Sequence, residues 1–99
     1  MSKFLVLYRS STSAQEQMAS ATPEQAQAGM EAWQAWAAKA GSAIVDLGAP
    51  LAGEGDITGF SILEADSRGQ LDGLLAEHPH RHMSGASIDA YEFLALPGM

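Results

Sequence analysis

The stretch Lys3-Phe4-Leu5-Val6-Leu7-Tyr8 decides how the rest of the chain is interpreted. It is rich in strand-forming residues, and side chains alternate between the two faces of a strand, so Phe4 and Val6 make one face apolar. Leu5 and Leu7 do the same for the other face. This pattern is typical of a strand that is covered on both sides. We therefore predict that it lies at the centre of a sheet.

A long helix is predicted over residues 23–40. Thr22 is a good N-cap, Pro23 suits the first helical position, and Gln25 completes a capping box. Gly41 supplies the left-handed residue on which many helices end. Between these signals, apolar residues recur at helical spacing and predict one buried face, made by Ala26, Met30, Trp33, Trp36 and Ala37.

The remaining segments alternate between strands and one further helix. A second capping pattern, at Ser67 and Gln70, predicts a short helix that runs to about Glu77. Residues 10–21 have no apolar periodicity and are predicted to be a flexible connection, and residues 78–85 are predicted to be a loop. The other predicted strands are residues 42–48, 57–65 and 87–96.

The predicted order of strand, helix, strand, strand, helix, strand matches the ferredoxin-like split βαβ arrangement. We therefore expect an α+β fold in a single domain spanning residues 1–99, with a four-stranded antiparallel sheet and two helices on one face. The first and third strands are central in this arrangement. The charges Asp46, Asp89 and Glu92 fall on the other two strands, where edge strands commonly carry them.

Composition limits the partners of the chain. With 46% hydrophobic and 17% charged residues, its 99 residues can form one globular core. A formal charge of −7 repels phosphate backbones and anionic lipids, so neither nucleic acid nor a membrane is expected as a partner. The absence of cysteine excludes disulfides and thiolate chemistry. The apolar run at residues 4–8 is too short for a signal peptide or a membrane span, so the cytoplasm is the expected location.

The second apolar face of the first strand needs a cover, since a monomer would leave it in water. A second copy of the chain, packed sheet against sheet, covers it most economically and gives a homodimer with a barrel-like core. Covering by the C-terminal tail of the same chain is the alternative.

The pattern resembles the YCII-related family. The resemblance rests on the opening strand at 3–8, Ala40-Gly41, Leu47-Gly48-Ala49-Pro50-Leu51, the segment Gly59-Phe60-Ser61-Ile62-Leu63-Glu64-Ala65-Asp66-Ser67, and His78-Pro79 after a helix. It implies a dimeric α+β barrel with a small cleft at one end of the sheet, in a family whose biochemical role is mostly undetermined. Some members of that family look to have a histidine on the first helix that is paired with an aspartate near the second strand. In this chain Asp46 is the candidate match for the acid, whereas Met30 and Trp33 stand where the histidine would be.

Antiparallel threading gathers several polar residues at one end of the sheet. The end of the first strand, with Tyr8 and Arg9, is expected to meet the turn after Asp46 and the segment that holds His78, His80 and His82. Imidazoles titrate near neutral pH, so they could serve as general acid and base. The same three histidines could instead cap a helix end or line a dimer seam in a solvated loop.

The candidate roles follow from residue chemistry. His80 and His82 are the catalytic candidates, with Asp46 as an assisting base if burial raises its pKa, or as a charge that merely blunts an edge strand. Tyr8, Arg9 and His78 are the candidates for substrate binding, because a guanidinium clamps a carboxylate well. The alternative for Arg9 is a surface ion pair with an acid of the chain.

No metal or other cofactor is predicted. An extended segment would place His78 and His82 roughly 13 Å apart, so chelation by all three histidines needs a curved loop. Haem binding would need one of these histidines to point into a cavity.

Two hypotheses about function follow. The first is a small enzyme, a lyase or isomerase that uses acid/base chemistry on a compact carboxylate-bearing metabolite. The second is a non-catalytic dimeric module that binds a small ligand or a partner.

Overall fold

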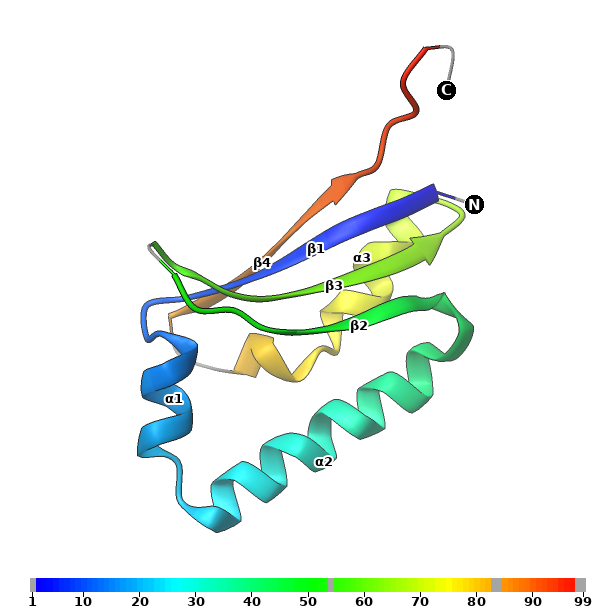
Figure 1. Cartoon of the computed structure of the whole chain (residues 1–99). Helices are drawn as coiled ribbons and strands as arrows, with labels where there is room; N and C mark the ends of the chain where they lie inside the picture. The colour runs from blue at the N-terminus through cyan, green and yellow to red at the C-terminus, as the bar shows by residue number, and fades with distance from the viewer. Residues whose placement is uncertain (1, 54, 83–84, 98–99) are drawn as a thin grey trace.

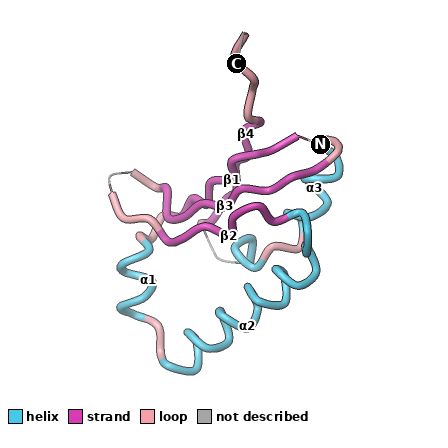
Figure 2. Tube along the Cα trace, turned by 45° about the vertical axis from the view of Figure 1, so that its right-hand side comes forward, coloured by secondary structure: helices cyan, strands magenta, loops and turns pink. Residues whose placement is uncertain are grey.

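The computed structural model describes residues 2–53, 55–82 and 85–97, apart from the side chain of His82. Four strands form one antiparallel sheet in the order β2-β3-β1-β4, and the helices lie on one side of it (Figures 1 and 2). The strands are β1 (Ser2–Ser10), β2 (Ile44–Pro50), β3 (Ile57–Ala65) and β4 (Ala86–Glu92). The helices are α1 (Ala14–Ser20), α2 (Pro23–Ala40) and α3 (Arg68–Ala76), with short 3-10 turns η1 (Gly41–Ala43) and η2 (Pro79–His82). The α+β fold with a ferredoxin-like arrangement is confirmed, as is the central position of β1 and β3.

The alternation of β1 divides its side chains between a core and an open face. Phe4, Val6 and Tyr8 are buried beneath the helices. Leu5 and Leu7 point the other way and are only partly buried. The first of these faces forms the hydrophobic core, together with Trp36, Leu63, Ala65, Leu71 and Leu75.

Helix α2 has the predicted bounds and caps. The hydroxyl of Thr22 accepts from the backbone N–H of Gln25, and the Gln25 side chain accepts from the Thr22 N–H, which completes the capping box. The predicted buried face is only half correct: Trp36 is buried and Trp33 and Ala37 pack against the core, but Ala26 is exposed and Met30 is 63% exposed. The reason is that residues 23–32 extend past the core, as Figure 1 shows for the end of α2 nearest α1.

Three segments differ from their predicted form. Residues 14–20 are a helix, α1, rather than a flexible connection, because the hydroxyl of Ser13 accepts from the Glu16 N–H and caps it. The predicted loop at 78–85 contains the 3-10 turn η2, whereas Met83 and Ser84 lie outside the described residues. Strand β4 ends at Glu92 instead of residue 96.

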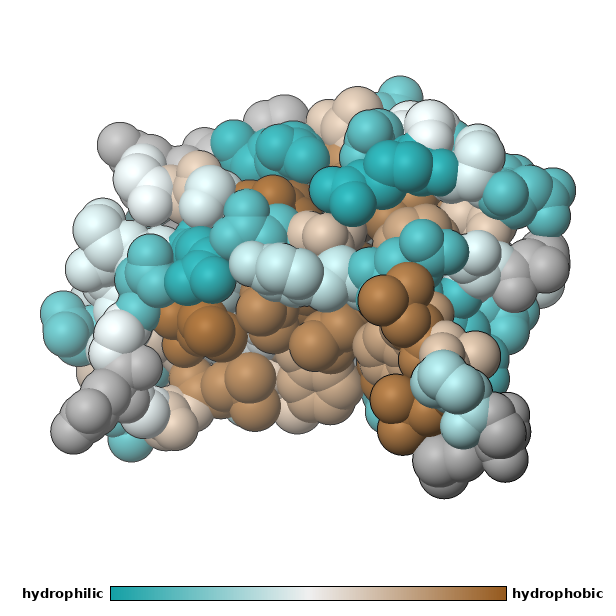
Figure 3. Space-filling model, turned by 90° about the horizontal axis from the view of Figure 1, so that it is seen from above, coloured by the Kyte–Doolittle hydropathy of each residue, from teal (hydrophilic) through white to brown (hydrophobic). Residues whose placement is uncertain are grey.

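The sheet face away from the helices, called the open face from here on, carries a patch of apolar side chains. Cross-strand pairs on it join Leu5 with Ile62 and Leu7 with Phe60, and Tyr91 of β4 lies opposite Leu5. Figure 3, which looks down on this side of the molecule, shows hydrophobic side chains gathered on it and bordered by hydrophilic ones. Beyond β4, residues 93–97 leave the sheet as an extended segment, which we call the C-terminal arm (Figures 1 and 2).

Gly48 gives the first testable prediction. It has a φ of +88°, and a Cβ there would lie 1.6 Å from the carbonyl oxygen of Phe60. Gly48→Ala is therefore expected to lower the free energy of unfolding by about 2 kcal/mol, measured by urea denaturation. Gly29→Ala in α2 is the matched control: its Cβ meets nothing within 4 Å, so a gain of about 0.5–1 kcal/mol is expected. Equal effects at the two glycines would contradict this account of the bulged β2–β3 pairing.

Candidate functional site

His78 lies at the centre of an aromatic cluster beneath the sheet. Its ring centroid is 4.3 Å from those of Trp33 and Trp36 and 4.7 Å from that of Tyr8, and the side chain is fully buried. The backbone N–H of His80 donates to His78 Nδ1 at 3.0 Å. Nδ1 must therefore be the unprotonated nitrogen, and the hydrogen of the neutral ring sits on Nε2.

The chemistry of His78 is that of a neutral, enclosed ring. Its Nε2 is buried without a hydrogen-bond partner among the described residues. The indole rings of Trp33 and Trp36 pack against the imidazole at interplanar angles of 87° and 60°. Burial, with smaller effects of the nearby His80 and Arg81 charges, lowers the pKa of His78 to about 3. His78 therefore stays uncharged at neutral pH.

His80 ties the η2 turn to the end of β1. Its Nε2 lies 2.7 Å from the backbone carbonyl oxygen of Arg9, so Nε2–H is the donor, and the residue is only 5% exposed. Its ring also packs 5.3 Å from that of Tyr8. The same turn is anchored by Arg81, whose Nε donates to the carbonyl of Leu75 at the end of α3. Residues far apart in sequence thus meet at one end of the sheet, as the antiparallel threading predicts.

Tyr8 starts a short chain of buried hydrogen bonds. Its hydroxyl donates to Ser61 Oγ at 2.8 Å, and Ser61 Oγ donates to the carbonyl of Leu47 at 2.6 Å. Burial raises the pKa of Tyr8 to about 12, although the Ser61 hydrogen bond opposes the shift. The tyrosine therefore stays protonated and links β1 to β2 through β3.

Arg9 points away from the histidines. Since it follows Tyr8 in the strand, its side chain lies on the open face, while its carbonyl faces His80. Its Nε donates to Asp89 at 2.5 Å and its Nη1 to Asp56 at 2.7 Å. These hydrogen bonds, that of Asp89 first, raise the pKa of the guanidinium. Its charge is already balanced by two carboxylates of the same chain.

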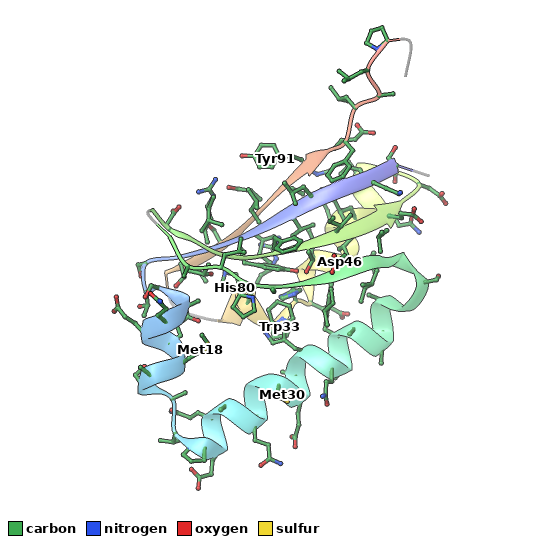
Figure 4. All side chains as sticks on the ribbon, in the orientation of Figure 1. Met18, Met30, Trp33, Asp46, His80 and Tyr91 are labelled. Carbon is green, nitrogen blue, oxygen red and sulfur yellow. The ribbon has the colours of Figure 1, made fainter. Side chains whose placement is uncertain are left out.

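Asp46 and His82 are not joined to this cluster. Asp46 is exposed on β2, where its carboxylate accepts from the Gly48 N–H at 2.8 Å and shapes the local bulge. The side chain of His82 lies outside the described residues. The structure thus brings together Tyr8, His78, His80 and the main chain of Arg9. Figure 4 shows His80 and Trp33 on the helix side of the sheet, with Tyr91 on the other side.

Several residues that shape this region were missed from the sequence. Ser61 is buried and bonds to Tyr8, and its place among the inward-facing positions of β3 was the available signal. Asp56 and Asp89 hold Arg9, and only the register of the sheet reveals that pairing. Trp33 and Trp36 appear in the helix pattern, but nothing in that pattern shows that they enclose His78.

A shallow groove of about 290 Å³ lies between α2 and the end of α3 and reaches Trp36. Its lining is Ala32, Ala35, Trp36, Lys39, Glu77 and Pro79. Lys39 and Glu77 form an ion pair across the two helices. Within the described part of the chain, no group of three His, Asp or Glu side chains lies close enough to hold a metal ion. None of the described helices is both long and apolar enough to cross a membrane.

Comparison with known proteins identified no relative of the chain. No family model, curated protein or solved structure matches the chain. The resemblance to the YCII-related family therefore stays a prediction, and the fold is established by the strand order and the packing of the helices.

Proposed function

We propose that the chain is a non-catalytic homodimeric module, assembled through the open faces of two sheets. The observation that carries this proposal is the apolar open face itself, in which Leu5, Leu7, Phe60 and Ile62 form a continuous patch across the two central strands. A patch of this kind on a small protein marks an interaction surface. A second copy is the simplest partner, because a two-fold axis pairs the patch with itself.

The large exposed area of the single chain supports the proposal that a second copy covers part of it. A compact folded monomer of 10.4 kDa exposes about 5,400 Å², whereas this chain exposes 6424 Å². The difference of about 1,000 Å² is similar to the roughly 800 Å² that each partner buries in a standard interface. The radius of gyration is 14.2 Å, whereas a compact domain of this length has about 12.6 Å. By this measure too, the single chain is less compact than an ordinary monomer.

The state of the polar residues favours a module over an enzyme. His80 Nε2 and His78 Nδ1 are hydrogen-bonded to backbone groups, and His78 Nε2 is buried among aromatic rings. Arg9 is balanced by its own acids, and the raised pKa of Tyr8 keeps it protonated. These groups hold the end of the sheet together. The groove between α2 and α3, which sheet-to-sheet packing would leave free, is where a ligand or partner would bind.

Leu7→Asp tests the dimer. Leu7 lies in the patch between Phe60 of β3 and Asp89 of β4, and a carboxylate there would be buried beside a second carboxylate in the assembled form. We expect the dissociation constant, measured by sedimentation equilibrium, to rise roughly 100-fold or more, since burying one unpaired polar group costs several kcal/mol. Met30→Asp, on the exposed part of α2, is the matched control and should leave the dimer unchanged.

Two outcomes would contradict the proposal. One is a wild-type chain that stays monomeric at every concentration tested. The other is a Leu7→Asp chain that dimerises as well as the wild type. Because each copy carries a formal charge of −7, added salt should tighten the dimer by screening repulsion between copies.

A further inference from the structure

The groove between α2 and α3 consists of two hollows that share part of their lining. The larger, of about 290 Å³, lies toward Pro79, and the smaller, of about 70 Å³, lies toward Gly73 of α3. Both are lined by Trp36, Lys39 and Glu77. The ion pair of Lys39 with Glu77 therefore stands where the two halves of one groove meet.

The lining of this groove is apolar apart from that ion pair. Ala32, Ala35 and Pro79 border the larger hollow, and Trp36 lines both. The indole N–H of Trp36 is already used, because it donates to the carbonyl of Leu74 at 2.9 Å. A ligand in the groove would thus meet an apolar floor and two charged side chains of opposite sign.

Of the two charged residues, Glu77 is the one that depends on its partner. Glu77 is the C-cap of α3, where the negative end of the helix dipole repels a carboxylate. Lys39 lies in the last turn of α2, where the same effect favours an ammonium group with or without Glu77. When the ion pair opens, Lys39 keeps a favourable environment, whereas Glu77 needs another cation.

The kind of cation follows from the groove and from the charge of the chain. The side chains of Lys39 and Glu77 are 67% and 62% exposed, and ion pairs this exposed are weak enough to exchange. A formal charge of −7 attracts cations and repels anions. A small molecule with an ammonium group and an apolar body would match the carboxylate with one part and the apolar floor with the other.

We propose that the groove binds an organic ammonium ion, which displaces Lys39 from Glu77 and packs its apolar body against Ala32, Ala35 and Pro79. The larger hollow is close to the lower limit of roughly 300 Å³ for small-molecule sites, so the ligand is a small amine. This inference rests on the proposed function for the choice of the groove. It adds the class of ligand and gives Lys39 the role of an internal competitor, and it does not depend on how two copies pair.

Titration with phenethylamine, which is protonated at neutral pH, tests the site. Calorimetry measures the affinity, and the NMR signal of the Trp36 indole N–H shows whether the ligand is in the groove. We expect saturable binding and a shift of that signal. Phenylpropionate carries the same ring with a negative charge, and phenethyl alcohol carries it with none. Both should bind roughly tenfold more weakly or worse.

Variants of the ion pair test the role of each partner. Glu77→Gln should weaken the binding of phenethylamine roughly tenfold, because it removes the carboxylate. Glu16→Gln makes the same change of charge on α1, away from the groove, and should leave the affinity unchanged. Lys39→Ala removes the competitor and should tighten binding roughly threefold to fivefold, whereas Lys39→Arg keeps a cation and should bind like the wild type. All of these side chains are exposed, so the fold is kept.

Three results would overturn the ligand proposal. They are the absence of saturable binding of phenethylamine, equal binding of phenylpropionate, and unchanged affinity after Glu77→Gln. A Lys39→Ala chain that binds more weakly than the wild type would overturn the displacement of Lys39. None of these results bears on the homodimer, which sedimentation equilibrium measures separately. A chain that binds the amine but stays monomeric would overturn the dimer and support the ligand site.

Discussion

His78→Ala is expected to lower the free energy of unfolding by about 3–5 kcal/mol, the range for removing a buried aromatic side chain. The ring is fully buried among Trp33, Trp36 and Tyr8, so its loss leaves a cavity that these rigid rings cannot easily fill. The substitution also leaves the buried His80 N–H without its acceptor. Urea denaturation followed by tryptophan fluorescence measures the change.

Two further variants separate these causes. His78→Phe keeps a ring but removes the Nδ1 acceptor, whereas His78→Asn keeps an acceptor near the Nδ1 position but removes the ring. Both should be more stable than His78→Ala and less stable than the wild type. A loss below about 1 kcal/mol for His78→Ala would be typical of a surface site and would contradict the described burial.

Acid is expected to destabilise the protein through the same residue. The pKa of His78 is about 3 in the folded chain and close to 6.5 when it is unfolded, so between these values the unfolded chain binds a proton that the folded chain does not. Stability is therefore fully retained above pH 6.5 and falls as the pH is lowered toward 3. The slope is about 1.4 kcal/mol per pH unit, or about 3 kcal/mol between pH 7 and pH 4.

The comparison with His78→Phe isolates this effect. Carboxylates titrate in both proteins over the acid range, so their contribution cancels when the two stability curves are subtracted. The difference between wild type and variant should shrink as the pH falls from 7 to 4. Parallel curves would show that His78 does not carry the acid sensitivity.

The sheet was predictable from sequence because its signals are local and agree with one another. The doubly apolar β1 and the charges Asp46 and Asp89 on other strands lead to the observed strand order. The capping box at Thr22 fixes the start of α2. Helix α1 was missed although Ser13 and Glu16 form a capping pattern, because a helix of seven residues has too few apolar positions to show a period.

The candidate site was less predictable because it depends on side-chain direction. Threading alone places Tyr8, Arg9 and His80 at one end of the sheet, and the structure agrees at the level of the main chain. Whether a side chain faces the helices or the open face changes with a single step along a strand, which separates Arg9 from Tyr8. The burial of His78 depends on the two indole rings of α2, and nothing near His78 in the sequence indicates them.

The central position of β1 has a consequence for how the chain folds. Its neighbours in the sheet are β3, which begins at Ile57, and β4, which begins at Ala86, so β1 pairs with segments that are synthesised much later than itself. Contacts between residues so far apart in sequence slow folding and leave an apolar strand unpaired while the ribosome works. Until β3 emerges, the apolar segment from Phe4 to Tyr8 therefore has no strand to pair with.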